Sequence, residues 1–444
     1  MIDQNSVSVL LCAGKGSRMN SARPKVLNTL CGKTMLSYVI DAQLKSGINR
    51  IIVVCNNENI DLIKASIGEE ISISYVIQDE QLGTADALKS ALTGNTFKDI
   101  SNLSVFFGDT PLVSESDIIS LSNTAKPNDI LIASFVTENP TGYGRVIKDN
   151  EGRVCNIIEE ADATAEEKSI NICFSGIIIF NKISALSLLD NIESDNIKEE
   201  FYLTDIIKIA HKNNLNVRDI LLEYDNVRGV NDYVQLSQAE KIMNDRIMRQ
   251  FMKMGVHIVS PDTSFIHPDT KFGKNVTIEP NVHIGEDVIF EDNILIKSFS
   301  YIEGATIRKG ASIGPFARIR PESNIGKNAK VGNFVELKNA NVADNVKINH
   351  LSYIGDADLG SGTNIGAGTI TCNFDGIEKY RTVIGKNAFI GSNSSLIAPI
   401  EISDNSYIGS GSVINKDVPM NSLALSRTEQ VIKDDWVKKR STKK

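Results

Sequence analysis

A glycine-rich turn follows the first apolar run of the chain and could hold a phosphate group. It reads Leu-Cys-Ala-Gly-Lys-Gly-Ser-Arg-Met over residues 11–19, and Pro24-Lys25 follows shortly after. Glycines let the backbone approach an anion closely, and backbone amides can point at its oxygens. Three cations, Lys15, Arg18 and Lys25, lie close together in a chain that is otherwise acidic. This neighbourhood predicts a phosphate site, whereas two glycines alone would favour a structural turn.

The turn differs from the two common phosphate-binding motifs. The P-loop pattern G-x-x-x-x-G-K-[ST] is absent. A dinucleotide fingerprint has its third glycine where this chain has Met19. A phosphate site of another kind is therefore expected.

A second group of charged, amide and aromatic residues lies between residues 318 and 381. Its members are Arg320, Glu336, Lys338, His350, Tyr353, Asn364, Asn373, Phe374 and Lys379. A histidine titrates near neutral pH and can accept a proton from a reacting group, so His350 is a candidate base. For a lone histidine, a surface position with a local hydrogen bond is the alternative.

The residues around the glycine-rich turn must be positioned by the first ~230 residues of the chain. In this part, stretches with the hydrophobic spacing of strands alternate with stretches that have the spacing of helices. Short apolar runs rich in β-branched residues predict strands at Ser6–Cys12, Ile51–Cys55, Ile71–Ile77, Leu103–Phe107, Ile130–Phe135 and Ser175–Phe180. Stretches with helical spacing include Met35–Ser46 and Ala85–Leu92. This alternation predicts an α/β domain with a mostly parallel sheet covered by helices on both faces.

A long helix and a short repeat follow. Residues Asp232–Met254 show amphipathic helical spacing without an internal Gly or Pro. From residue 255 an aliphatic residue, often followed by a small one, recurs every six positions, at least from Val276 to Ile414. Such hexapeptide repeats predict a parallel β-helix. We expect the aliphatic residue to fill the prism and the small one to permit the corner. The predicted domains are residues 1–230, a helical arm at 231–254, and residues 255–444.

Composition narrows the function. The 444 residues carry 47 basic and 55 acidic side chains, a net charge of −8, which argues against nucleic acid as a partner. No apolar run approaches the ~20 residues of a membrane span, and the first residues lack the positive start of a signal peptide. Six scattered cysteines form no close pair, so a reducing cytoplasm is expected.

Several short motifs occur one after another along the chain. After the glycine-rich turn and Pro24-Lys25-Val26-Leu27 come Gln81-Leu82-Gly83-Thr84-Ala85, Phe107-Gly108-Asp109-Thr110-Pro111-Leu112, Gly142-Tyr143-Gly144-Arg145, Ile158-Glu159, Tyr202-Leu203-Thr204-Asp205 and Gly229-Val230-Asn231. The second half has Arg320-Pro321, Gly332-Asn333-Phe334-Val335-Glu336-Leu337-Lys338, His350-Leu351-Ser352-Tyr353, Asn364-Ile365-Gly366-Ala367-Gly368-Thr369 and Cys372-Asn373-Phe374-Asp375-Gly376. Over nearly the whole chain this set resembles the bifunctional bacterial enzymes that are both UDP-N-acetylglucosamine pyrophosphorylase and glucosamine-1-phosphate N-acetyltransferase.

The resemblance implies a Rossmann-like nucleotidyltransferase domain, a linking helix and a left-handed parallel β-helix. It also implies roles in the first domain. Leu11 and Gly14 would hold the nucleotide; Arg18 and Lys25 would be catalytic; Gln78, Gly83 and Thr84 would bind uracil; Gly144 and Glu159 would bind the sugar; and Asp109 and Asn231 would hold Mg²⁺.

Taken singly, these residues have plainer interpretations. Asp109 and Asn231 could cap the elements that follow them. Gln78 could be a polar residue of an edge strand, and Glu159 could lie in a solvated acidic loop. One position departs from the family: Phe174 stands where a sugar-binding Asn is usual.

For the second domain the resemblance implies acetyl transfer from acetyl-CoA to glucosamine 1-phosphate. His350 would be the base, with Glu336 orienting it. Substrate would be bound by Arg320, Lys338, Tyr353, Asn364 and Lys379, and acetyl-CoA by Asn373, Phe374, Ser392, Ser410 and Arg427. Phe374 replaces the usual Tyr, and Ser410 a frequent Ala. The basic tail after residue 437 is expected to be a solvated end.

The prediction is a cytoplasmic homotrimer that acetylates glucosamine 1-phosphate and then joins N-acetylglucosamine 1-phosphate to UMP from UTP, for peptidoglycan synthesis. No aromatic or leucine stripe in the sequence indicates the trimer, which the resemblance alone implies. Two alternatives are a single-activity sugar nucleotidyltransferase with a structural or regulatory β-helix, and a β-helix scaffold with a degenerate catalytic domain.

Overall fold

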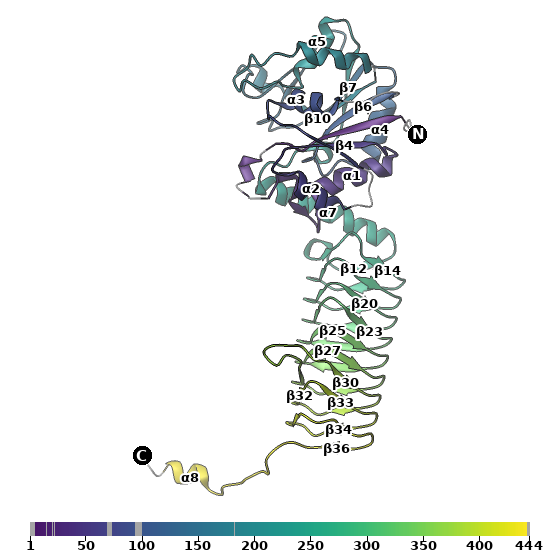
Figure 1. Ribbon diagram of the computed structural model, residues 1–444, viewed down its shortest axis with the longest axis vertical. Coiled ribbons are helices and arrows are strands. Elements are labelled where there is room, and N and C mark those ends of the chain that lie inside the picture. Colours follow the sequence, from purple (N-terminus) through teal and green to yellow (C-terminus); the bar gives the residue numbers. More distant parts are fainter. Residues whose placement is uncertain are drawn as a thin grey trace. The chain divides into compact units, whose positions relative to one another are not determined.

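The computed structural model describes residues 5–14, 16–19, 21, 23–68, 73–93, 100–181 and 183–441. Lys15 and the predicted strand residues 71–72 lie outside this part. The chain divides into two compact units, Met1–Met243 and Asn244–Lys444 (Figure 1).

The first unit is built on one nine-stranded sheet. Its main path runs β11 (Val217–Leu221), β7 (Ile130–Val136), β10 (Ile172–Phe180), β6 (Asn102–Phe107), β1 (Ser6–Leu11), β4 (Ile51–Cys55) and β5 (Ile73–Ile77). The strands β8 (Arg145–Lys148) and β9 (Val154–Ile158) form a hairpin that joins β10. Every strand predicted for this half of the chain is present, whereas β8, β9 and β11 were not predicted.

The sheet is mixed. Strand β1 is parallel to β4 and β6, β4 to β5, and β7 to β11. Strand β10 is antiparallel to both β6 and β7. The chain reaches β10 through the β8–β9 hairpin instead of a crossover helix, which accounts for its reversed direction.

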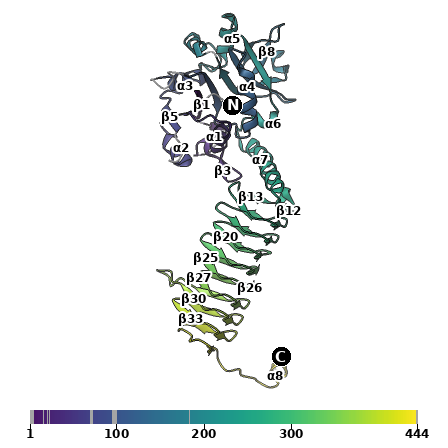
Figure 2. The ribbon, with the colours of Figure 1, turned by 90° about the vertical axis from the view of Figure 1, so that its right-hand side faces the viewer.

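Helices cover both faces of this sheet, as predicted (Figures 1 and 2). Alternate residues of β1 belong to two cores: Val9 packs in the core that includes α3 (Thr84–Ala91) and α5 (Asp205–Lys212), and Leu10 in the core that includes α1 (Met35–Ser46) and α4 (Glu115–Ala125). The other α-helices that lie wholly within the described part of this unit are α2 (Ile60–Ile67) and α6 (Tyr224–Val227).

In the sheet, β1 lies between β4, to which the chain runs next, and β6, so the strand order changes direction at β1. In open α/β sheets such a switch point, at the carboxyl ends of parallel strands, is where ligands bind. The glycine-rich turn follows β1, Gln78 follows β5 and Asp109 follows β6, so the strands bring these predicted residues to one edge.

The predicted long helix is α7 (Tyr233–Lys253), which spans the division between the two units. The limits at residues 230 and 254 stay a prediction.

The second unit is a parallel β-helix of short strands, as the repeat predicts. One face is a ten-stranded sheet from β12 (His257–Ile258) to β36 (Leu423–Ala424), and the other strands form a fifteen-stranded sheet. Among the strands used below, β24 (Lys330–Asn333), β26 (Lys347–His350) and β28 (Asn364–Ile365) belong to the first sheet, and β22 (Arg318–Ile319), β25 (Glu336–Val342) and β27 (Tyr353–Leu359) to the second. Aliphatic residues pair from coil to coil inside the prism, as in Ile296 with Ile313 and then Val331.

The expected role of the small residue was wrong. The corners are formed by residues in the left-handed conformation. Among them are Asn275, Asn281 and Asn293, whose positions differ by multiples of six, as the repeat requires. The glycine after the aliphatic residue is instead pressed by the next coil. A Cβ on Gly332 would lie 1.9 Å from the carbonyl oxygen of Asn349. Because neighbouring strands of stacked coils lie only about 4.8 Å apart, a side chain does not fit at this position, and glycine is required.

Candidate functional site

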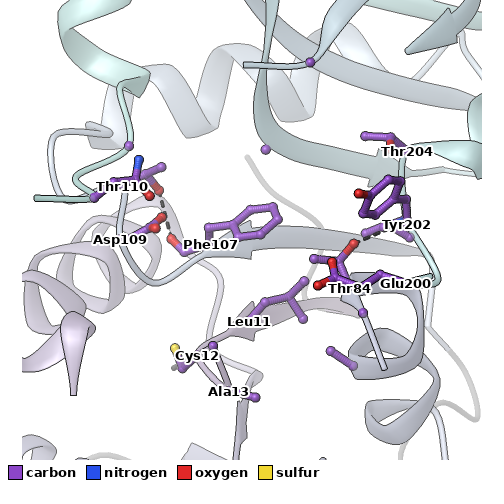
Figure 3. A pocket seen from close by; sticks show the side chains of 18 of the residues that line it. Leu11, Cys12, Ala13, Thr84, Phe107, Asp109, Thr110, Glu200, Tyr202 and Thr204 are labelled. Atoms are coloured by element: carbon purple, nitrogen blue, oxygen red, sulfur yellow. Dashed lines mark hydrogen bonds between the residues drawn. The ribbon is translucent and has the colours of Figure 1, made fainter. Parts of the chain in front are cut away.

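A cavity of about 640 Å³ opens at the carboxyl edge of the first sheet (Figure 3). Every residue predicted for the nucleotide and sugar site lines it: Leu11, Gly14, Arg18, Lys25, Gln78, Gly83, Thr84, Asp109, Gly144, Glu159 and Asn231. Residues more than 200 positions apart thus converge on one space. Lys15 lies outside the described residues.

At one end of the cavity, hydrogen bonds hold polar groups where a nucleobase could bind. The buried Gln78 amide donates to the Gly83 carbonyl oxygen at 3.0 Å and to Asp86 Oδ2 at 2.7 Å. Gly83 has φ of +131°, and a Cβ there would lie 2.5 Å from the Phe201 carbonyl oxygen. The Thr84 hydroxyl accepts from the Leu203 amide at 2.9 Å. Because its amide donates twice, the Gln78 side chain is held in one orientation with its carbonyl oxygen available as an acceptor.

At the other end, cations and oxygen donors gather around Lys25. Its ammonium group contacts Asp109 Oδ2 and donates to Asn231 Oδ1 at 2.8 Å. Arg18 donates to the same Asn231 oxygen at 2.7 Å. The Asp109 and Asn231 oxygens therefore converge on one positive charge, an arrangement that also suits a hard metal ion. Within the described residues, no group of three or more His, Cys, Asp or Glu side chains could hold a metal.

Glu159 is placed between Gly144 and Thr204. Thr204 donates its hydroxyl hydrogen to Glu159 Oε1 at 3.0 Å. Burial raises the pKa of Glu159, although this hydrogen bond and the nearby Lys198 act in the opposite direction. A carboxylate held in this way can accept hydrogen bonds from sugar hydroxyl groups.

The cavity also includes residues to which sequence analysis gave no role. Lys198, Glu200, Tyr202 and Thr204 line it from the segment before α5 (Figure 3). The motif Tyr202–Asp205 was the available signal, but it did not specify which side chain faces the cavity.

Phe174 lines the cavity too, with 8% of its surface exposed. Its amide donates to the Gly144 carbonyl oxygen at 2.8 Å, so it adjoins a predicted sugar contact. The departure from the family therefore places a ring on the wall of this cavity.

A second cluster lies on strands β22, β25 and β27 of the β-helix. Arg320 donates to Glu336 Oε1 at 3.0 Å, and Glu336 pairs in register with Tyr353 of the next coil. The Lys338 ammonium group lies 3.4 Å from Asp356 Oδ2. Lys379 is close enough to Lys338 that this neighbour lowers the pKa of Lys379. These cations could bind a phosphate group.

His350 and Asn364 lie on the other sheet, at the end of β26 and in β28. His350 is exposed at a corner, and its Nδ1 atom lies 2.7 Å from Asn333 Oδ1, one coil earlier. The expected partner, Glu336, instead accepts from Arg320. The structure thus shows Asn333 as a contact of His350, and the orienting role of Glu336 stays a prediction.

The residues predicted for acetyl-CoA fall into two places. Asn373 and Phe374 begin a loop that projects from the β-helix beside β27 and closes by a bridge between Phe374 and Lys379 (Figure 1). Ser392 and Ser410 lie on successive later coils, since the Gly411 amide donates to the Ser392 carbonyl oxygen. Arg427 donates to the Ser410 carbonyl oxygen at 3.0 Å.

The helices give no sign of a membrane span: in the described part of the chain, none combines the length and apolar character needed to cross a bilayer. The tail carries a short exposed helix, α8 (Trp436–Ser441), and residues 442–444 lie outside the described part.

Comparison with known proteins matches both halves of the chain. Residues 7–226 match the nucleotidyl transferase family, residues 301–397 the GMPPB C-terminal domain, and residues 381–416 the bacterial transferase hexapeptide (six repeats) family.

Similar proteins cover almost the full length. A bifunctional protein GlmU from Bartonella bacilliformis is 42% identical over 97% of this chain and 96% of its own. One from Bartonella quintana is 42% identical over 98% and 97%, respectively. One from Clostridioides difficile is 39% identical over 99% of both chains.

Proposed function

The chain belongs to the family of the bifunctional protein GlmU, and from this premise we propose which of its residues carry out each reaction. It is a bifunctional uridylyltransferase and acetyltransferase of UDP-N-acetylglucosamine synthesis, a step toward peptidoglycan. The observation that carries the residue proposal for the first reaction is the convergence of every predicted nucleotide and sugar residue on one cavity.

For uridylyl transfer, the oxygen of a sugar phosphate attacks the α-phosphorus of UTP and pyrophosphate leaves. This step needs alignment and neutralised charge rather than a covalent nucleophile. We assign the neutralisation to Arg18 and Lys25, whose cationic groups meet at Asn231. Gln78, Gly83 and Thr84 would hold uracil, Leu11 and Gly14 the rest of the nucleotide, and Gly144 and Glu159 the sugar.

We assign Mg²⁺ to Asp109 and Asn231. Their oxygens already converge on the Lys25 ammonium group, which supports a cation at this position. Mg²⁺ is commonly held by one or two carboxylates together with substrate phosphates, so two protein donors suffice. When bound, the ion would neutralise charge on the phosphate oxygens.

For acetyl transfer, the amine of glucosamine 1-phosphate must lose a proton as it attacks the thioester of acetyl-CoA. We assign His350 as the base. Asn333 Oδ1 is an acceptor, so it favours the tautomer that carries hydrogen on His350 Nδ1 and leaves Nε2 free to take the proton. Arg320 and Lys338 would hold the phosphate, and Tyr353, Asn364 and Lys379 the sugar. Acetyl-CoA would contact Asn373, Phe374, Ser392, Ser410 and Arg427.

We propose that the protein is a homotrimer. Phe299, Phe316 and Phe334 stack along one corner of the β-helix, with ring centroids 4.9 and 5.1 Å apart, and remain about half exposed. Leu351 continues this corner stripe beside His350. Its residues are one coil apart, 17 or 18 positions in the sequence, so the stripe does not show the spacing of a helix or a strand. An exposed apolar stripe of this length is a candidate contact with another copy.

A cytoplasmic location is proposed as well. All six cysteines are free thiols. Free thiols of this number fit a reducing compartment better than an oxidising one.

The test is product analysis by mass spectrometry after incubation with glucosamine 1-phosphate, acetyl-CoA, UTP and Mg²⁺. We expect UDP-N-acetylglucosamine and pyrophosphate. A single-activity nucleotidyltransferase would yield no acetylated product, and a scaffold would yield no product at all. Sedimentation of the same sample measures the oligomeric state.

A further inference from the structure

Asp356 is a buried acidic residue in the middle of the second cluster. It lies in β27 with 9% of its surface exposed, and its backbone has the left-handed φ of +48°. Aspartate, like the asparagines at the corners of the β-helix, adopts this conformation more readily than most other residues.

Three side chains donate to its carboxylate. Asn339 Nδ2 lies 2.8 Å from Oδ1, Lys338 Nζ lies 3.4 Å from Oδ2, and Asn373 Nδ2 also contacts Oδ2. Burial by itself would raise the pKa of Asp356, but the two asparagines and Lys338 hold it below its ordinary value. The group is therefore a permanent negative charge among amide and ammonium donors.

The donors come from the two halves of the predicted acetyltransferase site. Lys338 is a proposed phosphate ligand of glucosamine 1-phosphate, and Asn373 a proposed contact of acetyl-CoA. Lys379 is repelled by both Lys338 and Arg320, since each of them lowers the pKa of Lys379. A carboxylate beside Lys338 offsets that repulsion when no phosphate is bound.

We propose that Asp356 is a positioning residue that fixes Lys338 for the sugar phosphate and Asn373 for acetyl-CoA, so that one carboxylate sets the geometry of both subsites. This inference rests on the proposed acetyl transfer. We assign no substrate contact to Asp356, because its carboxylate already accepts from three protein side chains.

Asp358, two residues further along β27, supplies a matched control. It pairs with Arg381 and accepts from Asn341 Nδ2 at 2.8 Å, and it is more exposed than Asp356. Neither Arg381 nor Asn341 is a proposed substrate ligand. The same Asp-to-Asn change at this position removes a charge from the same strand without touching Lys338 or Asn373.

The experiment compares Asp356→Asn and Asp358→Asn in the full chain, with uridylyl transfer as an internal measure of intact protein. A carboxamide keeps the shape of Asp356 but loses the charge next to Lys338 and places an amide against a donor. We expect the KM for glucosamine 1-phosphate to rise about ten-fold, the value of one charged hydrogen bond, and the KM for acetyl-CoA to rise several-fold. The kcat should change by less than about three-fold, and Asp358→Asn should leave both KM values unchanged.

A double-mutant cycle with Lys338→Met separates positioning from general destabilisation. In the Lys338→Met protein, Asp356→Asn should no longer raise the KM for glucosamine 1-phosphate, while its effect on acetyl-CoA remains. An undiminished ten-fold effect in that background, or equal effects of the two Asp-to-Asn changes, overturns the inference. If the unmodified protein transfers no acetyl group, the proposed function fails instead.

Discussion

Replacing Gly83 by Ala should weaken binding of UTP at least ten-fold while leaving acetyl transfer intact. Gly83 precedes α3 with φ of +131° and ψ of 179°, a region that is essentially restricted to glycine. Gly68 has φ of +81° and ψ of 169°, in the same region, at the end of α2. Among the described residues, a Cβ at Gly68 meets nothing within 4 Å, whereas a Cβ at Gly83 would lie 2.5 Å from the Phe201 carbonyl oxygen and 2.7 Å from its nitrogen.

Comparing the two glycines distinguishes the cost of backbone strain, which both substitutions carry, from the cost of a steric clash, which arises only at Gly83. Strain costs about 1–3 kcal/mol at either glycine. At Gly83 the obstructing atoms are backbone, so the chain around Phe201 must move. That movement would break the hydrogen bonds from the Phe201 amide to the Leu82 oxygen, 2.8 Å, and from the Ala85 amide to the Phe201 oxygen, 2.9 Å. At about 1 kcal/mol for each, the total loss for Gly83→Ala is about 3–5 kcal/mol.

The assay is urea unfolding of Gly83→Ala and Gly68→Ala together with the KM for UTP and the rate of acetyl transfer. Gly83→Ala should lose about 2 kcal/mol more than Gly68→Ala and raise the KM for UTP at least ten-fold. Acetyl transfer should be unchanged in both variants. Equal losses of stability, with the KM for UTP unchanged, would refute the reasoning from the Phe201 contact.

Three further predictions concern the base, the metal ion and a buried carboxylate. His350→Ala should slow acetyl transfer by about 100-fold or more at unchanged uridylyl transfer, measured by thiol release from acetyl-CoA; an unchanged rate excludes His350 as the base. Chelation by EDTA should stop pyrophosphate release but not thiol release, and loss of both would contradict the assignment of the metal to one site. Because burial raises the pKa of Glu159 above 4.5, its ionisation opposes folding, a penalty that is absent below pH 4.5 and grows as pH rises through the raised pKa. The melting temperature of Glu159→Gln relative to the unmodified protein should therefore increase from pH 4 to pH 8, and a difference independent of pH would contradict this.

The first site was predictable because of where parallel strands end. Each of three predicted strands is followed at its carboxyl end by a predicted ligand: Gly14 after β1, Gln78 after β5 and Asp109 after β6. Parallel strands in one sheet bring these ends to one edge without any knowledge of side-chain contacts. By contrast, β8 reads Arg-Val-Ile-Lys and β9 reads Val-Cys-Asn-Ile-Ile, so each has only two adjacent aliphatic residues, and the hairpin was missed.

The second site was less predictable because a coil does not have a constant length. Asn333 lies 17 residues before His350, while Ile365 pairs with Ile390, 25 residues later, across the projecting loop. A period of six therefore predicts the fold but not which polar residues become neighbours. For this reason sequence analysis named Glu336 and not Asn333 beside His350, and the Phe299, Phe316 and Phe334 stripe was not recognised.

The two proposed phosphate sites contain the same pair of residue types in different arrangements. In each, a lysine contacts an aspartate, Lys25 with Asp109 and Lys338 with Asp356. Asp356 accepts from three side chains, so a metal ion would have to compete with three protein donors for its oxygens. Among the described residues, Lys25 is the side-chain donor to Asp109, so displacement of one lysine would free its carboxylate. This difference is why we expect a metal ion at the first site and not at the second, although we propose a phosphate ligand for both. It also explains how a chain with a net charge of −8 can bind anions: the carboxylates beside these lysines hold the cations in place.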